Sequence, residues 1–158
     1  GRRRVAFLGD ASQRFPEFHD RHRGCAAALT EAGLSLDPQL QVDAHSSEES
    51  GHAAAVELIR RGRRFDALFA ASDLIAVGAL RALAEHGLRV PDDVAVAGFD
   101  DIPAARFSHP PLTTVAQDTA SAGAMLVDTV MRQVRGEPAG SVMLPATLRV
   151  RQSSDPSA

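Results

Sequence analysis

The stretch Val94-Ala95-Val96-Ala97-Gly98-Phe99, followed at once by Asp100-Asp101, decides the fold of this chain. It is a continuous apolar run with no polar residue at alternate positions. Such runs are typical of strands inside parallel sheets, which are covered on both faces. Because ligands of open α/β sheets bind beyond the carboxyl ends of the strands, the two aspartates are candidate ligand-binding residues. The alternative is that an aspartate here caps the short turn after Ile102.

Strand-like and helix-like segments alternate along the rest of the chain. This order predicts an α/β fold with parallel strand pairing and right-handed crossovers. Extended segments are expected at residues 4–10, 39–44, 65–71, 94–99, 112–117 and 142–151. Helices are expected at residues 18–32, 47–61, 74–86 and 118–134, with one helical turn at 103–108. Ser46 with Glu49 predicts a capping box for the second helix, and Ser72-Asp73 and Asp118 are expected to cap the third and fourth.

The composition predicts one ordinary globular domain. The chain has 158 residues, of which 44% are hydrophobic and 23% charged, and its formal net charge is −3. A chain of this size folds without disulfides or metal. Its apolar runs are too short to span a membrane, and none is typical of a signal peptide. The slightly acidic balance argues against nucleic-acid binding by this chain alone. Cys25 is the single cysteine, which excludes an internal disulfide and a cysteine-rich zinc site.

Motifs of the common enzyme classes are missing from the sequence. It contains no Gly-x-Gly-x-x-Gly after the first strand, no P-loop, no Gly-x-Ser-x-Gly and no His-Glu-x-x-His. His19 and His22 share a predicted helix face but lack a third ligand, so we interpret them as solvated. The arginines of residues 60–64 lie at a predicted helix end, where cations offset the helix dipole. We therefore predict a protein that is not an enzyme and has no catalytic residue, metal site or cofactor.

Four stretches, in order along nearly the whole chain, resemble the effector-binding core of LacI/GalR transcriptional regulators. They are Arg21-His22-Arg23-Gly24 with the following helix and Gly33, then Ala70 to Leu80, then Gly87 to Asp101, and finally Pro110 to Gln117 with the terminal Leu148 to Ser153. The resemblance implies a periplasmic-binding-protein-like body of two lobes behind a helix-turn-helix domain. This chain then holds the second lobe, a parallel sheet flanked by helices in a three-layer α/β/α arrangement.

The resemblance also implies a division of the chain. Residues 1–112 form the second lobe, and residues 113–140 form a crossover and a helix of the otherwise missing first lobe. Residues 141–152 return to the second lobe, and residues 153–158 are a tail. The helix at 118–134 would lack its usual partners. We therefore expect its apolar stripe to be poorly buried, namely Ala122, Met125, Leu126, Thr129 and Val130.

The resemblance places a small effector between the two lobes. Arg21 resembles the effector-contacting arginine of the family, and Asp100 resembles its acidic residue at a strand end. A planar, multi-donor guanidinium and an acceptor carboxylate suit the vicinal hydroxyls of a sugar. The full set of candidate effector-binding residues is Arg21, Asp100, Ser72, Asp73, Gln117, Phe15, Glu17, His45 and Ser46.

Structural roles are the alternatives for several of these residues. Ser72 stands where many members of the family have asparagine, and Ser72 and Asp73 could instead cap the helix that follows. Gln117 could satisfy backbone groups at the crossover. Without the family resemblance, we would expect Arg21 to form an ion pair at the surface.

The function predicted from the resemblance is effector sensing and dimerisation within a LacI-type repressor. The effector is expected to be a sugar or related metabolite. A homodimer is expected through the helices at 47–61 and 74–86 and the segment near Phe107-Ser108, with Leu74, Ile75 and Leu80 as contact or core residues. Operator DNA would be bound only by a helix-turn-helix domain outside this chain, in the cytoplasm and without membrane contact. The alternatives are an exported sugar-binding protein and a small enzyme using Asp100 or Asp10.

Overall fold

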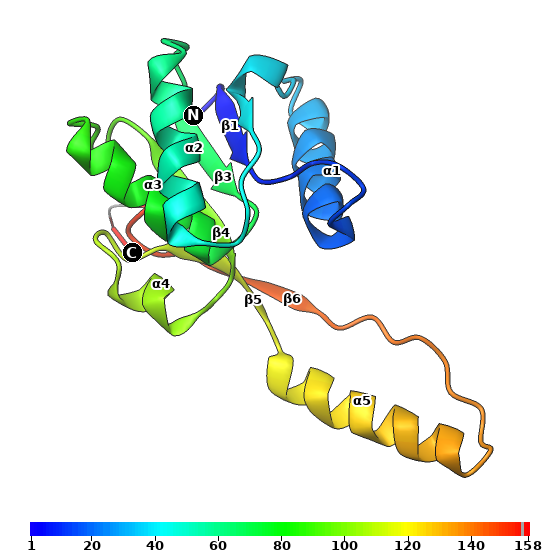
Figure 1. Ribbon diagram of the computed structural model, residues 1–158. Helices are drawn as coiled ribbons and strands as arrows, with labels where there is room; N and C mark the ends of the chain where they lie inside the picture. The colour runs from blue at the N-terminus through cyan, green and yellow to red at the C-terminus, as the bar shows by residue number, and fades with distance from the viewer. Residues whose placement is uncertain (156) are drawn as a thin grey trace.

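The computed structural model describes residues 1–155 and 157–158. Its core is one six-stranded sheet in the order β2-β1-β3-β4-β5-β6 (Figure 1). The strands are β1 (Val5–Leu8), β2 (Gln41–Val42), β3 (Ala67–Ala70), β4 (Ala95–Asp100), β5 (Thr113–Gln117) and β6 (Ala146–Arg149). The first five pair in parallel, as predicted, whereas β6 pairs antiparallel to β5. The final strand runs back because the chain returns along β5 after an excursion away from the sheet.

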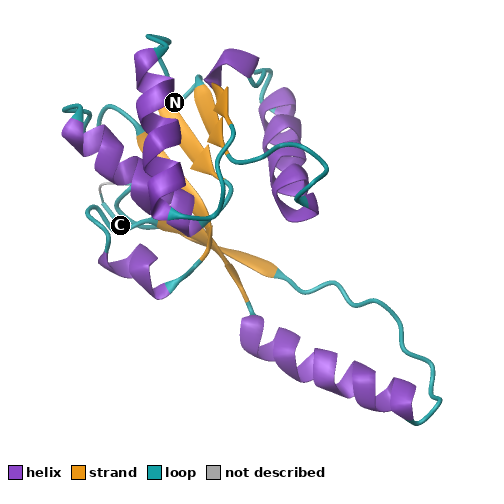
Figure 2. Cartoon of the chain, viewed as in Figure 1, coloured by secondary structure: helices purple, strands orange, loops and turns teal. Residues whose placement is uncertain are grey.

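Helices lie on both faces of the sheet, which gives the expected three layers (Figure 2). One face carries α1 (Pro16–Glu31), and the opposite face carries α2 (Glu48–Arg60) and α3 (Asp73–Glu85). The short helix α4 (Pro103–Phe107) follows β4, and the 3-10 turn η1 (Pro38–Leu40) leads into β2. None of the described helices is long and apolar enough to cross a membrane.

The apolar run around β4 is covered more fully on one face than on the other. Val96 is fully buried, and Gly98 packs against Asp73 and Ala76 of α3. Ala97 and Phe99 point to the other face and are only half-buried. The expectation of two fully covered faces is therefore wrong for this strand. The reason is the position of α1, whose His22 ring contacts Phe7 and which therefore lies over β1.

Helix caps follow the predicted chemistry with one correction. Ser72 caps α3 by accepting a hydrogen bond from the Ile75 amide (3.4 Å), and Asp118 caps α5 by accepting from the Ser121 amide (2.9 Å). At α2 the cap is Ser47, whose Oγ accepts from the Ser50 amide (3.1 Å), and not Ser46. The Ser46 hydroxyl lies 3.1 Å from the Ser72 hydroxyl instead. The cap of α2 is thus one residue later in the sequence than predicted. Ser46 lies before the helix, next to Ser72 at the carboxyl end of β3.

Helix α5 (Thr119–Val134) extends away from the body of the molecule (Figure 1). None of its residues is buried, and Leu126 is 66% and Val130 54% exposed. The expected poor burial of its apolar stripe is confirmed. Although the helix is amphipathic, its apolar side faces no packed layer within the described residues. The arm formed by α5 and the segment that returns to β6 is therefore held mainly by the β5–β6 pairing.

The rate of amide hydrogen exchange is expected to differ between this arm and the rest of the molecule. Isolated helices of this length are marginally stable in water, because most helix stability in proteins comes from packing. In this 158-residue chain by itself, the amides of α5 should therefore exchange at least about 100-fold faster than those of α3, which is packed in the core. Amide exchange followed by NMR or mass spectrometry measures this ratio, and equal protection of the two helices would contradict the exposed arrangement of α5.

Candidate functional site

Arg21 and Asp100, two residues far apart in the sequence, meet at the carboxyl ends of the strands. The Arg21 guanidinium donates from Nη2 to Asp100 Oδ1 at 3.1 Å and from Nη1 to the Ala71 carbonyl at 2.6 Å. Its central carbon lies 3.9 Å from the centre of the Phe99 ring. These contacts come from the ends of β3 and β4, and together they fix the orientation of the guanidinium. The structure therefore brings together Arg21 and Asp100, the two residues that the family resemblance singled out.

The crossover strand contributes a second partner for Asp100. Gln117, at the end of β5, donates from Nε2 to the same Asp100 oxygen at 2.9 Å. Partial burial raises the pKa of the Asp100 carboxyl, and the positive charge of Arg21 partly opposes this effect. Asp100 also adopts a φ of 116°, and Asp101 one of 53°. Residues other than glycine rarely take such angles, and those that do concentrate at functional sites.

A hollow of about 280 Å³ opens beside this pair. The lining residues come from α1, its preceding loop, and the ends of β2 and β4: Phe15, Glu17, Phe18, Arg21, His45, Ser46 and Asp100. Six of these were candidates from the sequence. Phe18 was not, although its spacing of three residues from both Phe15 and Arg21 places it on the same helix face. The ring centres of Phe15 and Phe18 lie 6.1 Å apart, so they form one aromatic wall.

Ser72 and Asp73 are buried beneath the residues that line this hollow and do not line it themselves. Ser72 is 1% exposed and Asp73 is 0% exposed. The Asp73 carboxylate accepts hydrogen bonds from the Thr114 hydroxyl (2.5 Å) and the Ile102 amide (3.0 Å). Both side chains are therefore directed at groups of the protein. The structural alternative for Ser72, that of a helix cap, is the geometry observed.

The arrangement suits a neutral, hydroxyl-bearing ring. A half-buried carboxylate accepts hydrogen bonds, a fixed guanidinium donates them, and aromatic rings offer flat apolar surface. The described residues contain no group of three histidine, cysteine or acidic side chains placed to hold a metal ion. The site can bind and orient a polar small molecule.

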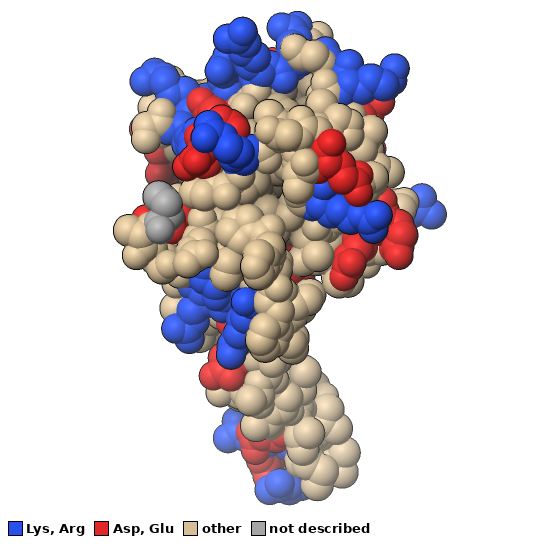
Figure 3. Space-filling view, turned by 90° about the vertical axis from the view of Figure 1, so that its left-hand side faces the viewer, with Lys and Arg blue, Asp and Glu red and all other residues tan. Residues whose placement is uncertain are grey.

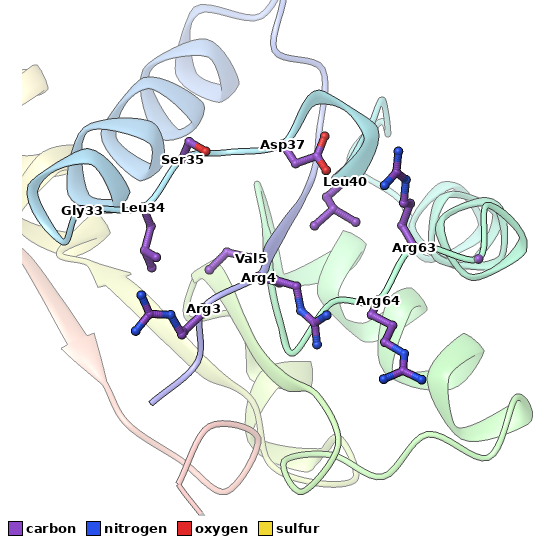
Figure 4. A pocket seen from close by; sticks show the side chains of 11 residues that line it. Arg3, Arg4, Val5, Gly33, Leu34, Ser35, Asp37, Leu40, Arg63 and Arg64 are labelled. Atoms are coloured by element: carbon purple, nitrogen blue, oxygen red, sulfur yellow. The ribbon is translucent and has the colours of Figure 1, made fainter.

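A larger hollow, of about 720 Å³, lies at the opposite end of the strands, where β1 begins (Figure 4). Its rim carries Arg3 and Arg4 before β1 and Arg63 and Arg64 after α2. Basic side chains gather at this end of the molecule, away from α5 (Figure 3). Helices α1 and α2 end here, and the partial negative charge of their carboxyl ends is offset by cations. This accords with the dipole interpretation of residues 60–64.

Comparisons with known proteins agree on one family. Residues 1–154 match the family described as periplasmic binding protein-like domain. The chain is 36% identical over 136 residues to the ribose operon repressor of Haemophilus influenzae, covering 85% of this chain and 41% of the repressor. It is 38% identical over 155 residues to the HTH-type transcriptional regulator CelR of Thermobifida fusca, covering 97% of this chain and 45% of the regulator. The chain thus spans less than half the length of these curated relatives.

Solved structures share the fold closely. A complex of the transcriptional regulator CelR with cellobiose superposes with a TM-score of 0.92 at 38% identity, covering 98% of this chain and 47% of that chain. A lac repressor dimer bound to operator and an anti-inducer gives a TM-score of 0.90 at 29% identity, with 98% and 53% coverage.

Proposed function

Since this chain belongs to the family of periplasmic binding protein-like domains, in the form found in LacI-type transcriptional regulators, we propose that it senses a sugar or a related polyhydroxylated metabolite for a DNA-binding repressor. One observation carries the proposal. The Arg21–Asp100 pair lies at the carboxyl rim of the sheet, fixed by the Ala71 carbonyl and the Phe99 ring, and borders a hollow. The relatives reported above are transcriptional regulators, which supports this function over that of an exported binding protein or an enzyme.

The chemistry of the hollow narrows the effector to neutral molecules with several hydroxyls. The paired carboxylate and guanidinium present no net charge to a ligand, and the carboxylate of Glu17 in the same lining repels anions, so an anionic effector would be disfavoured. Vicinal hydroxyls can instead donate to Asp100 and accept from Arg21, while a ring face packs on Phe15 and Phe18. The similar regulator CelR was solved with cellobiose, which has this character.

Each candidate residue takes a role in this proposal. Arg21 and Asp100 bind hydroxyls directly, and Gln117 binds the effector or holds Asp100 toward the crossover. The side chains of Phe15, Glu17, His45 and Ser46 set specificity, since they line the same hollow. We assign Ser72 and Asp73 to the support of this site, because they are enclosed beneath it.

We further propose that residues 1–112 form one lobe of a two-lobed body and that α5 packs into the other lobe. The exposed apolar stripe of α5 supports this division, since an amphipathic helix normally buries that side. A regulator of this kind would work in the cytoplasm and contact operator DNA through a helix-turn-helix domain. Effector binding between the lobes would then change their orientation and so the affinity for DNA.

Calorimetric titration of the full-length regulator with neutral sugars tests the proposed function. Cellobiose and ribose are the first probes, with glucose 6-phosphate and AMP as charged controls. We expect saturable binding of a neutral sugar and a matching change in operator affinity in a gel-shift assay. Saturable binding of only the charged molecules would contradict the proposal.

Acidification is expected to weaken effector binding. Asp100 forms an ion pair with Arg21, and accepts hydrogen bonds from hydroxyls with both of its oxygens, only when it is ionised. Burial raises its pKa, so it becomes protonated at a higher pH than an exposed aspartate does. Affinity should therefore be level near neutral pH and fall as the pH drops through this raised pKa. Titrations at a series of pH values measure the effect, and an affinity that holds until below about pH 4, the ordinary aspartate range, would argue against Asp100 as an acceptor.

A homodimer is proposed through α2, α3 and α4. Ile75 and Leu80 are buried in the core of this chain, so they are unsuited as contacts. Phe107 at the end of α4 is 82% exposed, and burial of such a ring is a typical source of interface stability. We expect Phe107→Asp to weaken self-association of the full-length protein by about 10-fold or more. Sedimentation velocity measures this, with Arg23→Ala on α1 as the control, and a variant that dimerises as tightly as the wild type would exclude this contact.

A further inference from the structure

Asp73 is a fully buried carboxylate that binds no described basic side chain. It is the first residue of α3, yet its two oxygens do not cap that helix, because Ser72 does so. Oδ1 accepts from the Thr114 hydroxyl on β5, and Oδ2 accepts from the Ile102 amide beyond the end of β4. Buried ionisable groups are costly unless their hydrogen bonds are complete. The contacts of Asp73 thus point away from its own helix and toward the turn that follows β4.

That turn has an unusual backbone. Asp100 and Asp101 both have positive φ angles, of 116° and 53°. Such conformations persist in residues other than glycine only when surrounding contacts impose them. Two consecutive amides of the turn are tied to the Asp73 network: Ile102 donates to Asp73 at 3.0 Å, and Asp101 donates to the Thr114 hydroxyl at 3.3 Å.

We propose that Asp73 is a positioning residue for the effector site, acting with Thr114 to hold the Asp100–Ile102 turn so that the Asp100 carboxylate meets Arg21 and the hollow. The inference rests on the proposed effector-binding role of Asp100. Thr114 gives its hydrogen to Asp73, which leaves its oxygen free to accept from the Asp101 amide. The charge of Asp73 therefore orients Thr114 as well as binding Ile102 directly. Burial also raises the pKa of Asp73, and the nearby carboxylates of Asp100 and Asp101 act in the same direction.

The alternative is that Asp73 serves stability alone. In that case its loss would lower the melting temperature and leave the site unchanged in the folded molecules. The proposal instead requires the site geometry to change. The readouts are thus the φ of Asp100, its distance from Arg21 and the exchange rate of the Ile102 amide, none of which depends on knowing the effector.

Crystal structures and amide exchange of three variants of this chain test the proposal. In Asp73→Asn the side chain keeps its shape but has one acceptor oxygen in place of two, so one of its two hydrogen bonds is lost, and the Ile102 amide should exchange about 10-fold faster. In Thr114→Val, Asp100 should leave its positive φ and move out of hydrogen-bond distance from Arg21. Thr114→Ser keeps the hydroxyl and should restore both measurements. Thr147→Val on β6 is the control, because within the described residues the exposed Thr147 side chain makes no hydrogen bond to the turn.

The outcomes separate this inference from the proposed function. A folded Thr114→Val variant with an unchanged Asp100–Arg21 pair and unchanged Ile102 exchange overturns the positioning role. If Asp73→Asn fails to fold, the comparison of Thr114→Val with Thr114→Ser still tests the positioning role. Sugar titrations of the full-length regulator test the proposed function separately, so failure of one leaves the result for the other intact.

Discussion

Replacing Arg21 with alanine is expected to lower the affinity of the full-length regulator for its effector by about 30-fold or more. The substitution removes the planar donor that contacts ligand hydroxyls. It also leaves the Asp100 carboxylate, 30% exposed, without the cation that pairs with it. Truncating one partner of such a hydrogen-bonded charge pair typically costs at least about 2 kcal/mol. Asp100→Ala should have an effect of similar size, because it leaves the 14% exposed guanidinium without its carboxylate.

Arg23→Ala provides the control for this experiment. Arg23 lies on the same helix, two residues further on, but its side chain is 74% exposed and pairs with Asp20. Exposed ion pairs of this kind contribute less than about 1 kcal/mol. Calorimetry should find near wild-type affinity for Arg23→Ala and a loss for Arg21→Ala and Asp100→Ala. Equal affinities in all of these variants would show that the effector binds elsewhere.

Gly78→Ala is expected to destabilise the body of the molecule strongly. Helices α2 and α3 approach so closely at this point that a Cβ on Gly78 would lie 2.0 Å from the Glu48 carbonyl oxygen and 2.7 Å from the His52 amide nitrogen. Both obstacles are backbone atoms, so no side-chain movement relieves the overlap. The helices would have to separate, and we expect a loss of about 3 kcal/mol in the free energy of unfolding.

Gly24→Ala is the matched control for this substitution. Gly24 is inside α1, and a Cβ there would have no neighbour within 4 Å. Alanine favours helices over glycine by up to about 1 kcal/mol, so this variant should be as stable as the wild type or slightly more so. Urea denaturation of both variants gives the comparison. Wild-type stability of Gly78→Ala would mean that α2 and α3 are further apart than described.

Local pattern was sufficient to predict most of the fold. The apolar run before Asp100-Asp101, the alternation of elements and the helix caps at Ser72 and Asp118 each depend on neighbours in the sequence. The antiparallel direction of β6 could not be predicted in this way. It depends on where the chain returns after α5, which no short-range signal specifies. The difference between Ser46 and Ser47 as the cap of α2 likewise depends on one residue of register.

In the candidate site, too, some features could be predicted from the sequence and others could not. The pairing of Arg21 with Asp100 was expected only because family resemblance connects residues that are 79 positions apart. The stacking of Arg21 on Phe99 and the inward direction of Asp73 were not predicted, since both depend on which way a side chain points at a strand or helix end. The positive φ angles of Asp100 and Asp101 were not predicted either, because most aspartates have negative φ angles and glycine is the residue most typical of positive ones.

A crystal structure of the full-length regulator bound to the sugar that calorimetry identifies tests the central claim most directly. We expect hydroxyl oxygens of the sugar within hydrogen-bond distance of both the Arg21 guanidinium and the Asp100 carboxylate, with a ring face against Phe15 or Phe18. A sugar bound away from this pair, for example at the arginine-rimmed hollow at the amino ends of the strands, would contradict the assignment of the site.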